Sequence, residues 1–323
     1  NKRIDEASRV TRTTQSYLYA GITVAFWSTV ATAFKLSLGY LDIFQLVLYA
    51  SVSAATVLVI PVIVSGNVGL MIDELRKYPM QTFGFALLNP LIYYLVLFAA
   101  YDRLPAQIAQ PVNYTWALVL VLLSIIFLGQ KPTRYDLIAT AVSYGGVVII
   151  ALGSGSDNVS FSLIGLGLAI LSTLIWASYW ILLMKDPRDE RVSMCLNFVT
   201  VLPMALVLCL IFSDLSVPWQ GWLGASYVGI FEMGLAFLFW SKALRLAENT
   251  SRVSTLIFLS PFISLWLIHL VLGETIYPTT YVGLAVIVTG LLIQRAPDLV
   301  LQSAKSNRRN VDPTQIGPQG PEP

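Results

Sequence analysis

Three side chains that could do acid–base or ion-pairing chemistry lie inside long apolar stretches: Lys35, Glu232 and His269. A carboxyl group deep in such a stretch is protonated, pairs with a cation or binds the amino group of a ligand, so we expect Glu232 to be functional. A neutral structural acid is the alternative. His269 lies near the end of its stretch, where a structural hydrogen bond is expected rather than proton relay. Lys35 can extend to the aqueous surface or meet a ligand carboxylate.

Amides and tyrosines form a second group of candidates. Gln107, Gln110 and Tyr114 share one face of a helix, and Asn113 precedes Tyr114. Pro111 removes a backbone hydrogen bond among them, which favours a kinked helix that lines an aqueous pocket. Hydrogen bonding between helices, with an ordinary kink, is the alternative.

A similar pattern occurs earlier in the chain. Asn89 precedes Pro90, and Tyr93 follows one helical turn later. Lining of a pocket and packing between helices are equally compatible with this spacing.

Aromatic side chains form the third group. Trp176, Tyr179 and Trp180 share a helical face, Trp27 is their counterpart near the start of the chain, and Trp240 lies two turns beyond Glu232. Their rings can stack on an aromatic ligand, and their N–H and O–H groups supply donors. Aromatic residues also gather at membrane interfaces, the role expected of those that begin their stretches: Trp219, Trp222, Tyr277 and Tyr281.

The candidate substrate-binding residues are therefore polar or aromatic side chains at depth in apolar segments. They are Trp27, Asn89, Tyr93, Gln110, Asn113, Tyr114, Trp176, Tyr179, Trp180, Glu232 and Trp240. No catalytic residue, metal site or cofactor is expected, because there is no phosphate-binding GxxxxGK[ST] loop, no histidine cluster and no nucleophile with an evident base. Cys195 and Cys209, the only cysteines, fit small buried apolar positions.

The elements that position these residues are ten apolar stretches, each long enough to cross a lipid bilayer as an α-helix. The chain is 56% hydrophobic and 12% charged, as expected for a polytopic membrane protein in contact with lipid. A net charge of +2 makes nucleic acid an improbable partner. The predicted spans are 17–38, 42–65, 80–101, 105–129, 135–153, 161–184, 193–213, 219–242, 252–272 and 277–295.

Basic residues follow the alternation of these spans. With the N-terminus in the cytoplasm, 18 of the 20 Lys and Arg residues lie on the cytoplasmic side, and Lys35 and Arg103 lie on the other. Basic flanks are retained in the cytoplasm. The pattern predicts a multi-pass protein of the bacterial cytoplasmic (inner) membrane with both termini cytoplasmic and a polar segment at 1–16 that precedes an uncleaved signal anchor.

An internal repeat divides the chain. Residues 129–146 (GQKPTRYDLIATAVSYGG) and 273–290 (GETIYPTTYVGLAVIVTG) each begin at a loop glycine and end an apolar helix in glycine after 17 residues. Five spans per half make the second half enter the membrane from the opposite side, an architecture common in secondary transporters. We therefore expect an all-α membrane protein of two inverted five-helix repeats, 17–153 and 161–295, followed by a disordered cytoplasmic tail at 296–323.

These residues resemble the ten-helix branch of the drug/metabolite transporter superfamily. The similarity is closest over 251–293, where Pro261 interrupts a span before the Gly273–Glu274 turn. The segment PVNYTWA at 111–117 looks like that of the bacterial exporter of aromatic amino acids, although Ala117 stands where proline is expected. The resemblance implies a basket of ten helices that opens alternately to either side and exports amino acids or related small metabolites without enzymatic chemistry.

The expected function is thus secondary transport of amino acids, aromatic or bulky neutral, out of the cytoplasm. The main alternative is a proton-coupled exporter of other metabolites, nucleosides or drugs that uses Glu232 as proton carrier. A passive channel needs a continuous polar stripe, which is not evident here, and a membrane enzyme is the remaining alternative. Substrate identity and oligomeric partners do not follow from these patterns.

Overall fold

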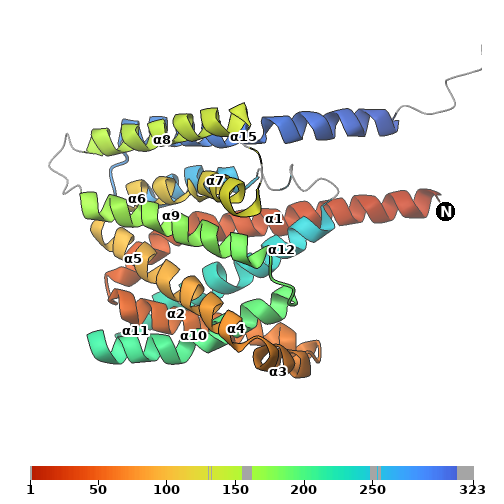
Figure 1. Cartoon of the computed structure of the whole chain (residues 1–323). Helices are drawn as coiled ribbons and strands as arrows, with labels where there is room; N and C mark the ends of the chain where they lie inside the picture. Colours follow the sequence, from red (N-terminus) through yellow and green to blue (C-terminus); the bar gives the residue numbers. More distant parts are fainter. Residues whose placement is uncertain are drawn as a thin grey trace, which may run out of the picture.

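The computed structural model describes residues 2–129, 131, 133–154, 162–247, 253 and 256–310. Every regular element in these residues is helical, which confirms the predicted all-helical class (Figure 1). Within these described residues, eight helical segments are long and apolar enough to cross a membrane, and two shorter apolar helices, Leu256–Leu272 and Pro278–Gln294, cover the last two predicted spans. The arrangement of ten spans in two repeats stays a prediction.

The first half of the chain contains the following helices. They are α1 (Lys2–Leu38), α2 (Ile43–Val64), the short α3 (Val68–Lys77), α4 (Pro79–Ala86), η1 (Leu87–Ile92), α5 (Tyr93–Arg103), α6 (Ala106–Asn113), α7 (Trp116–Leu128) and α8 (Arg134–Ser154). Of these, α4, η1 and α5 form one interrupted segment, and α6 and α7 form another.

The second half of the chain is also helical in its described residues. It contains α9 (Leu163–Leu183), α10 (Glu190–Phe212), α11 (Trp219–Tyr227), η2 (Val228–Leu235), α12 (Ala236–Leu246), η3 (Leu256–Leu259), α14 (Ser260–Leu267), η4 (Ile268–Leu272) and α15 (Pro278–Asn310). The segments α11–η2–α12 and η3–α14–η4 are again interrupted.

The two repeat glycines have the same structural role. Gly129 ends α7 with φ +65°, and Gly273 ends η4 with φ +68°. Glycine adopts this left-handed conformation without the steric cost that a Cβ atom brings, so it terminates each helix. The sequence repeat therefore marks equivalent helix ends.

Several helices depart from α-helical geometry at mid-length. Asn89, before Pro90, has φ −143° and ψ 117° inside η1, and η2, which contains Glu232, is a π-helical segment. Residues Tyr114 and Thr115 form a turn between α6 and α7. Irregular backbone within a membrane is tolerated where it is buried in protein or lines a cavity, so these interruptions point to a functional interior.

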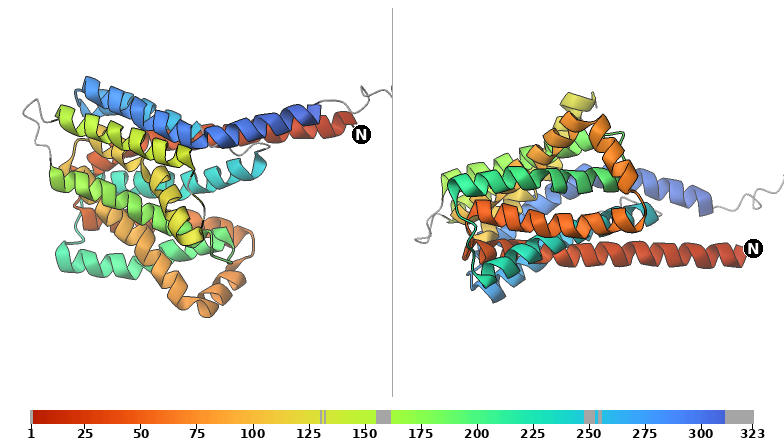
Figure 2. Two further views of the ribbon diagram at one scale, coloured as in Figure 1. Left: turned by 45° about the horizontal axis from the view of Figure 1, so that its top comes forward. Right: turned by 90° about the horizontal axis from the view of Figure 1, so that it is seen from below.

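Packing of the helices follows a paired pattern. α8 lies along α15 at one edge of the bundle, and α2 packs on α10 (Figures 1 and 2). α1 contacts α12 and α14, while α9 contacts α5 and α7. Apolar side chains cover much of the outside, such as Val64, which is 81% exposed, as expected of a surface that faces lipid.

α8 and α15 approach through small residues. A Cβ atom added to Gly146 would lie 2.8 Å from Ile287 Cγ1 and 3.0 Å from its backbone nitrogen, and one added to Gly283 would lie 2.6 Å from the Gly146 carbonyl oxygen. Backbones can come this close only where side chains are absent.

The N-terminal end of α1 and the C-terminal end of α15 project from the same end of the bundle, here called the terminal face (Figures 1 and 2). α1 begins at Lys2, so the polar segment before the first span is part of that helix. The disorder expected beyond 295 is wrong for 296–310, because α15 continues to Asn310. Good helix formers such as Leu301 and Ala304 outweigh the polar composition there; residues 311–323 lie outside the described chain.

Candidate substrate-binding cavity

A cavity of about 370 Å³ lies among the interrupted helices. Its lining comes from α1, α5, α6, α7, α9, η2, α12 and η3. Nine of the eleven residues predicted from sequence to bind substrate line it: Trp27, Tyr93, Gln110, Asn113, Tyr114, Trp176, Trp180, Glu232 and Trp240. The structure brings these side chains together, and their contact with a substrate stays a prediction.

Aromatic rings form a continuous wall around this cavity. Trp176 stacks on Tyr93 with ring centroids 4.6 Å apart, and it meets Phe237 at 5.6 Å. Trp27 contacts Phe237 at 6.2 Å and Trp240 at 5.4 Å. Rings at these separations favour each other and present flat faces to a bound molecule.

Polar groups of the cavity divide into those that are paired and those that are not. Asn113 Nδ2 donates to Ser172 Oγ at 3.0 Å, and the Tyr114 hydroxyl donates to Ser260 Oγ at 2.8 Å. By contrast, Gln110 Oε1 makes no hydrogen bond to a described residue. The bonds of Asn113 and Tyr114 hold the kinked helix in place, whereas Gln110, which also lines the cavity, has a buried carbonyl oxygen without a partner among the described residues.

Glu232 is the acidic group of this lining. Its Oε1 atom is 3.5 Å from the Tyr94 hydroxyl, at the limit of a hydrogen bond, and Oε2 has no partner among the described residues. The Trp27 indole lies near the carboxyl group without hydrogen-bond geometry. An incompletely paired carboxyl in an apolar cavity is costly, which favours a functional reason for it.

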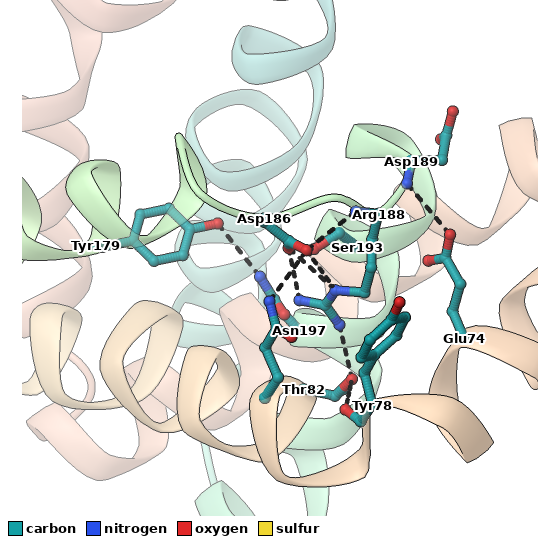
Figure 3. A network of polar contacts seen from close by, with 10 residues as sticks. Glu74, Tyr78, Thr82, Tyr179, Asp186, Arg188, Asp189, Ser193 and Asn197 are labelled. Atoms are coloured by element: carbon teal, nitrogen blue, oxygen red, sulfur yellow. Dashed lines mark hydrogen bonds and ion pairs between the residues drawn. The ribbon is translucent and has the colours of Figure 1, made fainter.

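Asn89 and Tyr179, the other two predicted residues, lie outside this cavity. They line a neighbouring cavity of about 270 Å³, which shares Trp180 and Trp240 with the first. The Tyr179 hydroxyl accepts a hydrogen bond from Asn197 Nδ2 at 3.2 Å (Figure 3). Tyr179 therefore has a structural partner.

The second cavity reaches the terminal face. Its far rim carries Glu190, at the start of α10, and Arg245, near the end of α12. Arg245 Nη2 lies 3.5 Å from Glu190 Oε2 and donates to Ser241 Oγ at 2.7 Å. The two cavities share the lining residues Trp180, Phe237, Trp240 and Leu244, so they lie next to each other between the centre of the bundle and this face.

The opposite end of the bundle is closed by hydrogen bonds. Lys35 Nζ donates to the carbonyl oxygens of Tyr101 at 2.7 Å and Leu104 at 3.0 Å. Glu274 Oε1 accepts from the Ala106 amide at 2.9 Å, at the start of α6, and its carbonyl oxygen lies 2.9 Å from His269 Nδ1. Lys35 and His269 thus have structural partners.

Gln107 belongs to the same closure, although its helical face had suggested the cavity. Its Nε2 donates to the Thr275 carbonyl at 2.9 Å. Its Oε1 accepts from the Tyr277 amide at 3.0 Å and the Thr280 hydroxyl at 3.1 Å. A fully bonded amide holds the start of α6 against the residues that precede and begin α15.

Several lining residues were missed from the sequence, among them Tyr101, Trp116 and Phe237. Phe237 stands five positions after Glu232, a spacing that an α-helix places off the same face. Glu232 lies in the π-helical η2, whose turns are wider than those of an α-helix, and Phe237 follows in α12; the wider turns change the face of Phe237, which lines the cavity with Glu232. Trp116 starts α7 after the turn at Tyr114, so the helical spacing of α6 does not predict the direction in which Trp116 points.

Within the described part of the chain, no group of three or more His, Cys, Asp or Glu side chains could hold a metal ion. The described groups of this lining that could contact a ligand are aromatic rings, amides and the Glu232 carboxyl group.

Comparison with known proteins agrees with this architecture. A 205-residue match is 29% identical to an "Uncharacterized transporter in sor 3'region" of Acidianus ambivalens and covers 61% of this chain and 76% of that protein. A match to "Protein PecM" of Dickeya dadantii is 28% identical and covers 73% and 78% of the two chains. A match to a "Probable terminal-alkyne amino-acid exporter" of Streptantibioticus cattleyicolor is 23% identical and covers 84% and 90%.

A solved crystal structure has the same fold, with a TM-score of 0.64 at 19% identity, and the match covers 87% of this chain and 96% of that one. The model of the EamA-like transporter family matches twice, over residues 14–152 and again over 163–294. The superfamily inferred from the sequence is thereby confirmed. This chain belongs to the EamA-like transporter family.

Proposed function

We propose that this protein is a secondary transporter that exports amino acids, aromatic or bulky neutral, from the cytoplasm by alternating access. The central observation is the cavity of about 370 Å³, which combines an aromatic wall with the Glu232 carboxyl group. Its size suits a small organic ligand. The ring faces would stack on the substrate side chain, and Glu232 would receive its amino group. A distant relative that is named an amino-acid exporter supports this substrate class.

The proposal includes ten spans in two inverted repeats, 17–153 and 161–295. The double match of the family model and the equivalent left-handed ends at Gly129 and Gly273 support it. So does the packing, since α1 contacts α12 and α14 in the way that α9 contacts α5 and α7. Interrupted helices in corresponding positions of two halves are typical of transporters that bind substrate between them.

Alternating access requires that the cavity open to one side at a time. The second cavity, with Glu190 and Arg245 at its rim, lies toward the terminal face, and the bonds of Lys35, Gln107 and Glu274 hold the helices together at the other end. We infer that the terminal face is cytoplasmic, in a bacterial inner membrane, because basic residues concentrate in its loops. The structure would then be the inward-open state.

A second candidate is proton-coupled export of other metabolites, nucleosides or drugs. The observation that favours it is the unpartnered Oε2 atom of Glu232, since a buried carboxyl can gain or lose a proton as a ligand leaves or arrives. Both candidates share the fold and the cavity.

Uptake of radiolabelled phenylalanine by proteoliposomes tests the first candidate. We expect saturable uptake that unlabelled tryptophan competes, and Trp176→Ala should raise KM at least tenfold because it removes a stacking face. Trp219→Ala is the matched control, because Trp219 is 71% exposed at the start of α11. Absence of saturable uptake for every aromatic and bulky neutral amino acid would discard amino-acid export.

Glu232→Gln separates the two candidates. If the proton is the coupling ion, this variant loses the acceleration that an imposed pH gradient produces but keeps exchange of internal for external substrate. If Glu232 serves only to bind the amino group, exchange weakens together with net uptake.

A further inference from the structure

The central cavity contains an acidic side chain whose charge, when it is ionised, no described residue of the lining balances. Glu232 is its only acidic residue, and no Lys, Arg or His stands among the described residues that line it. With Glu232 ionised, the empty site holds a net charge of −1 in an apolar surrounding. A charge in such surroundings is costly until a partner of opposite sign arrives.

Three basic side chains of the neighbouring helices have partners elsewhere. Lys35 donates to two backbone carbonyls at the closed end. Lys242 lies over the Tyr19 ring, 4.4 Å from its centroid, and Arg245 pairs with Glu190 at the rim of the second cavity. None of these three lines the central cavity, so a carboxylate placed there would meet no cation.

The unpartnered hydrogen-bonding groups of the lining also favour a ligand that donates hydrogen bonds. Glu232 Oε2 and Gln110 Oε1 are acceptors without a partner among the described residues. The donors of Asn113 and Tyr114 are used on Ser172 and Ser260. Trp180 Nε1 is an unpartnered donor, but one neutral N–H group does not compensate a buried carboxylate. These two unpartnered acceptors would suit a group with several N–H donors.

We propose that this cavity selects aromatic amines, that is organic ammonium ions with an aromatic body, over amino acids and carboxylic acids of the same size. This inference rests on the proposed function of the cavity as the substrate site. An amine cation brings the site to neutrality, an amino acid zwitterion leaves it at −1, and an anion raises the charge to −2. The faces of Trp27, Trp176 and Trp240 add cation–π attraction for the ammonium group.

Binding of three indole compounds to the purified full chain tests the selection. Tryptamine, tryptophan and indole-3-propionate carry net charges of +1, 0 and −1 near neutral pH on the same ring. We expect the dissociation constant of tryptamine to be at least tenfold below that of tryptophan, with indole-3-propionate weakest. Equilibrium binding is the measurement for all three, and transport in proteoliposomes is measured for tryptophan.

Three variants connect the selection to the residues. Glu232→Gln should bring the ratio of the tryptophan and tryptamine dissociation constants close to one. Gln110→Lys, which places a cation in the cavity, should reverse the order. Asp73→Asn, at an exposed carboxylate of α3, removes the same charge far from the cavity and should keep the wild-type ratio.

The outcomes separate this inference from the proposed function. Equal or tighter binding of tryptophan, together with its transport, overturns the selection for amines and leaves amino-acid export standing. Tight binding of tryptamine without binding or transport of tryptophan upholds the selection and discards amino-acid export. Failure of all three compounds to bind overturns both. If Glu232→Gln does not fold, the ratio of the tryptophan and tryptamine dissociation constants of the wild-type protein still tests the selection.

Discussion

A buried ion pair at the terminal face shows how individual residues join the two halves of the chain. Asp186 and Arg188, in the loop between α9 and α10, pair at 2.8 Å with side chains 2% and 0% exposed (Figure 3). Arg188 Nη1 also donates to Thr82 Oγ1 at 2.7 Å, on α4. Gln81 and Ser193 donate to Asp186. The loop of the second half is thus bonded to the first half.

Loss of Arg188 should destabilise the protein. Arg188→Ala leaves the Asp186 carboxylate buried without its cation, and removing one partner of such a pair costs about 3 kcal/mol. We expect a lower apparent Tm in detergent. The double variant Arg188→Ala/Asp186→Asn should recover part of the loss, because no uncompensated charge remains; a further decrease would contradict this explanation.

Acid should weaken the same contact. Burial acts to raise the pKa of Asp186, but the hydrogen bonds and charge of Arg188 outweigh it and hold this pKa below its ordinary value of 3.8. A depressed folded-state pKa contributes stability above the unfolded-state pKa, and that contribution is lost as the pH falls through the folded value. We expect Asp186→Asn to flatten the decline of Tm below about pH 4, measured against Asp73→Asn. Identical profiles for the two variants would refute this role.

At the scale of elements, the contact between α8 and α15 depends on glycine. Gly146→Leu would force a side chain into the Gly283 and Ile287 backbone, and overpacking of this kind costs about 1–3 kcal/mol or more. Its neighbour offers a matched control, because a Cβ added at Gly145 meets no atom within 4 Å. Thermal unfolding in lipid nanodiscs should show a large loss for Gly146→Leu and little change for Gly145→Leu. Equal losses would mean that the close contact of Gly146 with α15 does not set the effect, since leucine favours the helix more than glycine at both positions.

At the scale of the whole molecule, transport should require the closed end to open, so a covalent crosslink there should block transport. Gln107 Nε2 bonds the Thr275 carbonyl at 2.9 Å, so cysteines at these two positions lie within reach of a bifunctional thiol crosslinker. In a background without Cys195 and Cys209, both of which are free and buried, joining Gln107→Cys to Thr275→Cys with a reducible crosslinker should stop transport, and reduction should restore it. Single-cysteine variants control for the loss of Gln107. Undiminished transport by the fully crosslinked protein would rule out opening at this end.

Orientation of the bundle gives a second prediction at this scale. Cysteines at Ser8 and Ser303 should be protected from a membrane-impermeant thiol reagent in intact cells, while one at Tyr40, in the exposed connection from α1 to α2, should react. The reason is that basic loops concentrate at the face from which both termini project. Labelling of Ser8→Cys without Ser303→Cys would mean an odd number of spans and would remove the inverted repeat.

Local sequence was enough to predict the helices and most of the cavity. Apolar length placed spans such as 42–65 within a residue or two of α2, and polar or aromatic side chains at depth identified nine residues of one lining. Both depend on the cost of polar groups in lipid, which is a property of each segment by itself. The repeat glycines likewise require no partner to adopt a left-handed conformation.

Tertiary structure decided which contacts each side chain of these helices makes. Gln107 bonds the Thr275 carbonyl at the closed end, and Tyr179 bonds Asn197. Phe237 lines the same cavity as Glu232 because a π-helical segment interrupts the α-helical spacing between them. Among the described residues, the tertiary structure also placed no basic side chain in the lining of the central cavity. These outcomes arise from contacts between helices far apart in the chain, and because hydropathy and helical period describe one segment at a time, they contain no information about such contacts.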